Sequence, residues 1–286
     1  MDVTSLTQDP DIAGESIATP GSHVPPAALL TPDPAKIQDV PRSYAPLNIH
    51  GNAHQATPRS AALVADVGGP AALLRMTTHF YNLAFKDPHL DKFIRDRTDP
   101  HAQRFANWIT EKLGVSQAWT DERRTRPVVP IVLANNLRTT SPHDRSTAHG
   151  AAWSSPKRDP ADVGRHFDLT DCRVWMRLHF WALKKAGLHV ASPSFTEYYA
   201  RFLGHFVRVY ERRAPAFARD SYRWSDNPAN LEAYAKDGKM TDLMGMSATD
   251  HVSSILVEEA RDAEWPYYMT YEDQVNGRGV DDSFYP

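Results

Sequence analysis

Four side chains of types that bind small ligands or metal ions stand out in this sequence: Tyr81, His101, His149 and Trp175. Tyr81, His101 and Trp175 each carry an O–H or N–H group that can donate a hydrogen bond. A donor aimed into a pocket without water stabilises negative charge on a ligand more strongly than it would in solvent. The neutral imidazole of His149 can ligate a metal ion. Three donors on three predicted helices favour ligand stabilisation or redox chemistry over rapid ligand release.

Cys172 is the single cysteine, which excludes an intramolecular disulfide and a cysteine-based zinc site. We expect its thiol to be buried and without chemistry of its own. The sequence holds no HExxH and no paired HxH pattern. Any histidine ligand would therefore be an isolated histidine.

Helical periodicity and cap signals predict the elements that must position these side chains. The predicted helices span roughly residues 70–86, 100–113, 171–186 and 194–213. One Asp-Pro pair ends the first helix, and a second Asp-Pro pair starts the next. Tyr81 falls in the first predicted helix, His101 in the second and Trp175 in the third.

The chain divides into three parts. Residues 1–60 are rich in Pro, Ser, Thr and Ala without any period, which predicts a disordered leader. Residues 61–215 form a helical domain with an irregular insertion over 120–165, where only the run from Val128 to Leu133 alternates like a strand. Residues 216–286 form an extension that we expect to be partly helical. The predicted fold class is all-α, a helical bundle between a leader and an extension.

The order of the sequence motifs over residues 67–119 resembles that of the truncated haemoglobins, and among them the second group. The matching features are the Gly68-Gly69 pair, the Phe80-Tyr81 pair, the Asp87-Pro88 turn, Phe93, and the Phe/Trp-rich helix from His101. Residues 170–212 resemble the later helices of that family. The Gly-Gly-Pro turn that usually follows the distal helix is Gly114-Val115-Ser116 here.

This resemblance implies a globin-like bundle around haem b and its iron. The family's ligand-side positions fall on Tyr81, which would reach the haem ligand, Phe93, which would pack on the porphyrin, His101 at the distal-helix position, Phe105 one turn later over the ring, and Trp175 in the distal pocket. The propionates would need cations, for which Arg104, Arg145, Lys157 and Arg158 are candidates.

The insertion prevents simple spacing from placing the histidine that would bind the iron. We favour His149 because the alanines beside it are small enough to let a porphyrin approach. His166 is the alternative, since it also precedes the helix of Trp175 closely, and His143 is a weaker one. Whichever of His149 and His166 binds the iron, its neutral imidazole would be the ligand, and the second ring nitrogen would donate a hydrogen bond to another group.

Two function classes follow. The resemblance implies a haem protein that binds O₂ or a related diatomic gas, with peroxidase or nitric-oxide dioxygenase chemistry as the enzymatic activity that it could support. The alternative is a haem-free globin-like module for protein–protein interaction. The residues by themselves also fit plainer interpretations: Phe80, Tyr81 and Trp175 as core aromatics, His101 as an exposed first-turn residue, and His149 as a solvated loop histidine.

The composition points away from nucleic-acid and membrane partners. Lys plus Arg total 32 and Asp plus Glu 35, which gives a formal net charge of -3, so bulk electrostatics favour neither nucleic acid nor an anionic membrane. The mean hydropathy is -0.51, and no long uncharged apolar run predicts a transmembrane helix. The first residues are acidic and resemble neither a secretory signal nor a mitochondrial transit peptide, so we expect a cytoplasmic protein.

Overall fold

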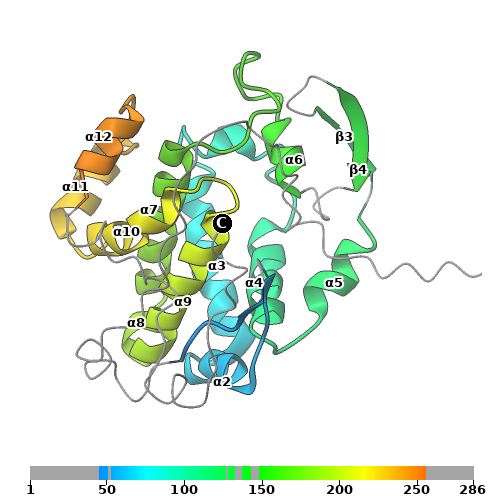
Figure 1. Ribbon diagram of the computed structural model, residues 1–286, viewed down its shortest axis with the longest axis vertical. Helices are drawn as coiled ribbons and strands as arrows, with labels where there is room; N and C mark the ends of the chain where they lie inside the picture. Colours follow the sequence, from blue (N-terminus) through cyan, green and yellow to red (C-terminus); the bar gives the residue numbers. More distant parts are fainter. Residues whose placement is uncertain (1–44, 51–52, 127, 133–136, 143–147, 256–286) are drawn as a thin grey trace, which may run out of the picture.

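The structure is a computed structural model that describes residues 45–50, 53–126, 128–132, 137–142 and 148–255. Four helices make up the centre of the molecule (Figure 1): α3 (Gly69–Ala84), α4 (His101–Lys112), α7 (Leu169–Lys185) and α9 (Pro193–Val207). These helices confirm the all-α class and match the four predicted segments to within a turn or two. α3 packs against both α4 and α7.

The local sequence explains where the two helices under the site begin. α3 starts behind Gly68, whose φ of 94° lies in the left-handed region that glycine adopts without strain, and Pro70 stands in its first turn. α7 starts with a capping box, in which Asp168 accepts from the backbone N–H of Asp171 and the Asp171 carboxylate accepts from that of Asp168. Gly187 ends the helix in the left-handed region.

The end of the expected leader differs from the prediction of disorder. Residues 45–60 pack on the bundle through β1 (Ile49–His50), its antiparallel partner β2 (Ala53–His54) and the start of α2 (Pro58–Asp66). Ala45, Leu47 and Ile49 are buried in the main core cluster. The guanidinium of Arg201 donates to the Ala45 carbonyl at 2.8 Å. Residues 1–44 of the expected leader lie outside the described residues.

The insertion over 120–165 contains more regular structure than its composition suggested. The end of α5 (Ala118–Arg123) is followed by the antiparallel pair β3 (Val128–Val132) and β4 (Arg138–Pro142), and then by the short helix α6 (Ala148–Trp153). The strand-like run at Val128 is thus a real strand, although its last predicted residue, Leu133, lies outside the described residues. Ser141 and Pro142 belong to β4, and the short helix that carries His149 begins at Ala148.

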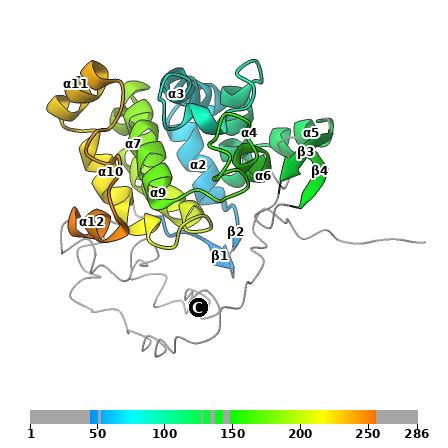
Figure 2. The same cartoon turned by 90° about the horizontal axis from the view of Figure 1, so that it is seen from above.

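The C-terminal extension is helical and packs against the core. It comprises the 3₁₀ turn η2 (Ala214–Phe217), α10 (Ala218–Trp224), α11 (Pro228–Asp237) and α12 (Ala248–Ser253). Figure 2 shows these helices on one side of α7, with α5 and the β3–β4 pair on the opposite side of the molecule. Residues 256–286 of the expected extension lie outside the described residues.

Two buried arginines on α7 hold this extension. The Arg173 guanidinium donates to Asp220 at 2.8 Å, to Ser254 at 2.9 Å and to Nδ1 of His251 at 2.9 Å. Arg177 donates to Asp242 at 2.7 Å. The two guanidinium groups also lie over the rings of Phe217 and Trp224. A buried cation without partners destabilises the folded protein. Because the extension supplies the partners of Arg173 and Arg177, these contacts hold it against α7.

Within the part of the chain that the structure describes, no helix combines the length and the apolar character needed to cross a lipid bilayer.

Candidate functional site

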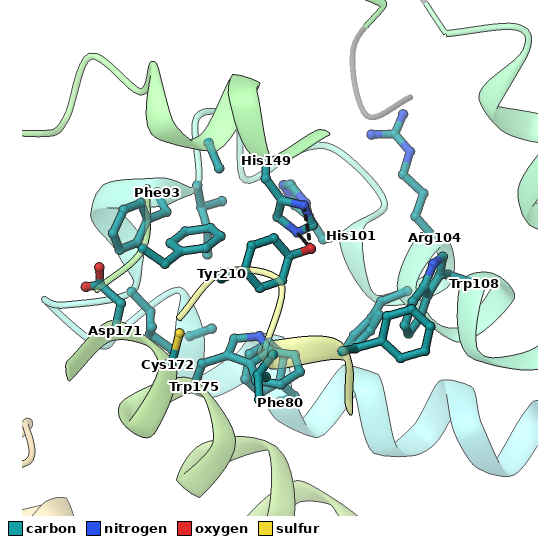
Figure 3. A pocket seen from close by; sticks show the side chains of 18 of the residues that line it. Phe80, Phe93, His101, Arg104, Trp108, His149, Asp171, Cys172, Trp175 and Tyr210 are labelled. Carbon is teal, nitrogen blue, oxygen red and sulfur yellow. Dashed lines mark hydrogen bonds between the residues drawn. The ribbon is translucent and has the colours of Figure 1, made fainter. Parts of the chain in front are cut away.

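A cavity of about 290 Å³ opens among α3, α4, α6, α7 and the end of α9 (Figure 3). The six residues predicted from the sequence to bind the cofactor, its iron or its ligand all lie on its wall: Tyr81, Phe93, His101, Phe105, His149 and Trp175. These side chains come from segments up to about a hundred residues apart, and the structure brings them together around one apolar space. Ten Phe, Tyr and Trp side chains line this wall.

The α7 side of the cavity is an aromatic cluster with a neutral histidine beneath it. The ring of Trp175 stacks on His179 with centroids 4.9 Å apart and an angle of 15°. Phe80 and Phe105 pack edge-on or tilted against both rings. Burial lowers the pKa of His179 to about 3, so the ring is neutral, and its Nε2 lies 2.8 Å from the hydroxyl of Tyr199. Trp175 is therefore held rigidly at the cavity wall.

Tyr81 and His101 meet where α3 crosses α4. Their rings stack with centroids 5.3 Å apart and an angle of 27°. Nε2 of His101 lies 2.6 Å from the backbone carbonyl oxygen of Asp96. Because a carbonyl only accepts, this nitrogen carries the proton and donates to Asp96. The N–H of His101 is thus directed to the backbone, while its ring supports Tyr81.

His149 reaches the cavity from α6 inside a group of aromatic rings. Phe167 lies edge-on at 5.6 Å and Tyr210 at 4.5 Å between centroids. The other predicted ligand, His166, stacks on Trp153 at 3.9 Å and is exposed, away from the cavity wall. His143 lies outside the described residues. Of the described candidates, only His149 faces the cavity.

Phe93 marks the other end of the cavity, next to a buried carboxylate. Its ring packs edge-on against Phe167 at 4.9 Å. Asp171 also lines this end, and its carboxylate lies 2.5 Å from Nε2 of His89 and 3.4 Å from Nζ of Lys92. Burial acts to raise the pKa of Asp171, but the contacts with His89 and Lys92 outweigh it, so the pKa is lowered and the group is ionised.

His89, Asp168 and Asp171 also place three potential metal-ligand atoms within 4.8 Å of one another. Both aspartates already serve the capping box of α7, and the Lys92 ammonium stands beside Asp171. A metal ion would have to compete with this nearby positive charge. Helix capping therefore accounts for the cluster.

The expected anion-binding cations are only partly at the cavity. Arg104 lines it and also pairs with Asp99 at 3.1 Å and Glu122 at 3.0 Å. Lys157 pairs with Asp91, and Arg158 donates to the carbonyls of Trp153 and Arg165. Arg145 lies outside the described residues. Two cations absent from the prediction, Arg95 and Lys112, line the cavity with Arg104.

Sequence reasoning also missed other aromatic wall residues, among them Phe167, Phe206 and Tyr210. A signal for two of them existed, because Phe206 and Tyr210 continue the i, i+4 row of Phe202 along the last central helix. Phe167 lies in a loop and had no periodic signal. Cys172, expected to be an inert buried thiol, is buried at the cavity wall, and burial raises the pKa of its thiol.

The donor set of the cavity fits haem. The wall is rich in aromatic rings that can pack on a porphyrin, one imidazole reaches in from α6, and cations line the same space. Tyr81 and Trp175 add an O–H and an N–H group to the wall.

Comparisons of the chain with protein-family models, with curated proteins and with solved structures give no match.

Proposed function

We propose that this protein binds haem in the cavity between α4, α6 and α7 and, through the haem iron, O₂ or a related diatomic gas. The observation that carries the proposal is the convergence of Tyr81, Phe93, His101, Phe105, His149 and Trp175 on a single aromatic cavity. A set of unrelated core aromatics would have no reason to collect with a histidine around an open space, since cores are close-packed.

In this proposal the residues divide into those that hold the cofactor and those that face its ligand. His149 would bind the iron, and the aromatic rings of Phe93 and Phe105 would pack on the macrocycle. Arg95, Arg104 and Lys112 would neutralise its carboxylates. When bound, haem supplies a redox-active iron with a coordination position for a gas molecule.

Tyr81 and Trp175 would act on that gas molecule. Each can donate a hydrogen bond from a wall that is largely apolar, where such a bond is stronger than in water. His101 contributes differently from the sequence-based expectation. Its N–H is bonded to the Asp96 carbonyl, so its role in the free protein is to fix the ring of Tyr81 by stacking.

The test is a titration of the purified full chain with ferric haem, followed by absorption spectroscopy. We expect one equivalent of haem to give a Soret band, and His149→Ala to abolish the native band, with partial recovery when imidazole is added. His166→Ala is the matched control, since His166 stacks on Trp153 away from the cavity, and it should leave the spectrum unchanged. Failure to take up one equivalent, or an unaltered band in His149→Ala, would reject the proposal and leave a haem-free interaction module.

A further inference from the structure

The hydroxyl of Tyr210 makes an unusual contact with His149. Its oxygen lies 2.8 Å from Nδ1 and 3.2 Å from Nε2 of the same ring, and Figure 3 shows the two side chains turned toward one another. The two nitrogens of an imidazole point away from each other in the ring plane, so an oxygen aligned with one is distant from the other. An oxygen at both observed distances and in that plane would overlap Cε1. The Tyr210 hydroxyl therefore lies over the face of the imidazole.

This placement has a direct chemical consequence. A nitrogen that binds a metal uses a lone pair in the plane of the ring. The Tyr210 hydroxyl covers the face of the imidazole. It does not lie in the ring plane, along the direction of either nitrogen's lone pair or N–H bond. It restrains the tilt of the His149 ring without competing for the position that an iron ion would occupy.

The helix that carries His149 needs such a restraint. α6 has only 6 residues, Ala148–Trp153, and a helix this short is not stable without tertiary contacts. The imidazole is enclosed by Trp153 from its own helix, Phe167 from the loop before α7, and Tyr210 from the segment after α9. Among these three rings, Tyr210 lies closest to His149, and its hydroxyl group is in contact with the imidazole.

We propose that Tyr210 is a positioning residue for His149, which holds the imidazole plane in the orientation needed for a nitrogen to bind a ligand in the cavity. This inference rests on the proposed function for the identity of that ligand, haem iron. The contact itself belongs to the protein without haem and can be measured there.

The first experiment uses the haem-free full chain. Nitrogen-15 NMR of the His149 ring reports its tautomer, its protonation and its mobility. Tyr210→Phe keeps the ring and removes the hydroxyl, so we expect a changed His149 ring shift and greater ring mobility. Tyr222→Phe is the matched control, because Tyr222 packs on Phe180 and Lys184, away from the cavity. An unchanged His149 ring in Tyr210→Phe would overturn the inference.

The second experiment uses the haem-loaded full chain. In Tyr210→Phe we expect haem loss to an excess of a haem-scavenging globin to be on the order of 10-fold faster, as for other residues that orient a metal ligand. The stretching frequency of the iron–imidazole bond, measured by resonance Raman spectroscopy, should shift, which simple loss of packing in another part of the protein would not cause. Wild-type values for both would overturn the inference.

The two experiments separate the two ideas. If neither the wild type nor any variant binds haem, the proposed function fails, and the NMR comparison still decides whether Tyr210 positions His149. If haem binds and Tyr210→Phe behaves as wild type in both experiments, the proposed function stands and the role of Tyr210 is rejected.

Discussion

At the scale of single residues, the cavity wall combines rigid and adjustable side chains. Trp175 is fixed by stacking on the neutral, fully buried His179, whereas Tyr81 is partly exposed and supported by His101. The sequence correctly placed Tyr81, His101 and Trp175 on three separate helices. It could not indicate that the N–H of His101 is bonded to the Asp96 carbonyl, because that contact depends on the path of the loop before α4.

Tyr81→Phe tests the expected role of the tyrosine hydroxyl in the haem-loaded protein. The substitution removes one donor and keeps the ring that stacks on His101. A hydrogen bond to a charged group contributes about 1.5–3 kcal/mol, so O₂ dissociation should become roughly 10- to 100-fold faster. Stopped-flow displacement of bound O₂ measures the rate. A rate equal to that of the wild type would show that Tyr81 does not contact the bound gas.

At the scale of elements, α7 links the site to the C-terminal extension. Trp175 and Cys172 face the cavity, whereas Arg173 and Arg177 reach the helices that follow α9. The predicted helix boundaries were nearly correct because caps and stop signals are local. The partners of the two arginines are 47 and 65 residues away, at Asp220 and Asp242, and no local signal pairs them.

Asp220→Asn should destabilise the folded protein. Arg173 is almost fully buried, and the neutral amide would leave its guanidinium without a counter-charge. The Asp220 side chain is 23% exposed, so we expect the lower end of the usual cost, about 3 kcal/mol, as measured by urea unfolding. Asp242→Asn is the matched control, because that side chain is 57% exposed and should cost less than about 1 kcal/mol. Equal losses would refute this assignment.

His251 makes the attachment of α12 dependent on pH. Arg173 can only donate, so Nδ1 of His251 must accept and the ring must be neutral, while Nε2 lies 2.7 Å from the hydroxyl of Thr170. Burial and then the positive charge of Arg173 lower the pKa of His251 below its ordinary value of 6.5; Arg177 and Arg213 act in the same direction, and Asp168 opposes them. Above pH 6.5 the ring is neutral in both states and this contribution to stability is complete.

Below pH 6.5 the unfolded chain takes up a proton at His251 that the folded protein excludes. The free energy of unfolding therefore decreases as the pH falls toward the lowered pKa that His251 has in the folded protein. In His251→Asn, the amide oxygen can replace Nδ1 as the acceptor and does not titrate. We expect the free energy of unfolding to fall less between pH 7 and pH 5 in this variant than in the wild type. Urea unfolding at both pH values measures the difference, and parallel losses in the two proteins would exclude His251 as the cause.

At the scale of the whole molecule, the sequence predicted the central helices and missed the structured segment before them. Ala45, Leu47 and Ile49 follow the period of 2 that a strand with one buried face shows. This alternation is short and lies among prolines and polar residues. The composition of residues 1–60 therefore led to the prediction of a disordered leader. The cavity could be anticipated only through the resemblance, because its wall residues are distant in sequence and the ring of Tyr210 reaches it from beyond α9.

A pair of truncations tests the segment over residues 45–60. A chain that starts at Ala45 keeps every contact described here, including the 2.6 Å contact between His54 and the hydroxyl of Tyr198. A chain that starts at Thr57 loses Leu47 and Ile49 from the core, at about 2 kcal/mol each. Thermal unfolding should show a clearly lower midpoint for the shorter chain. Identical midpoints would mean that the segment contributes nothing to stability.

The two arginines on α7 also determine how the molecule comes apart. If the extension detached from an intact core, Arg173 and Arg177 would lose their carboxylate partners, and the side chains of Phe217 and Leu243, which are buried in the main core cluster, would be exposed to water. We expect that intermediate to be less favourable than the folded protein and the unfolded chain. Core and extension therefore form one cooperative unit, and calorimetry of the full chain should record a single transition for both.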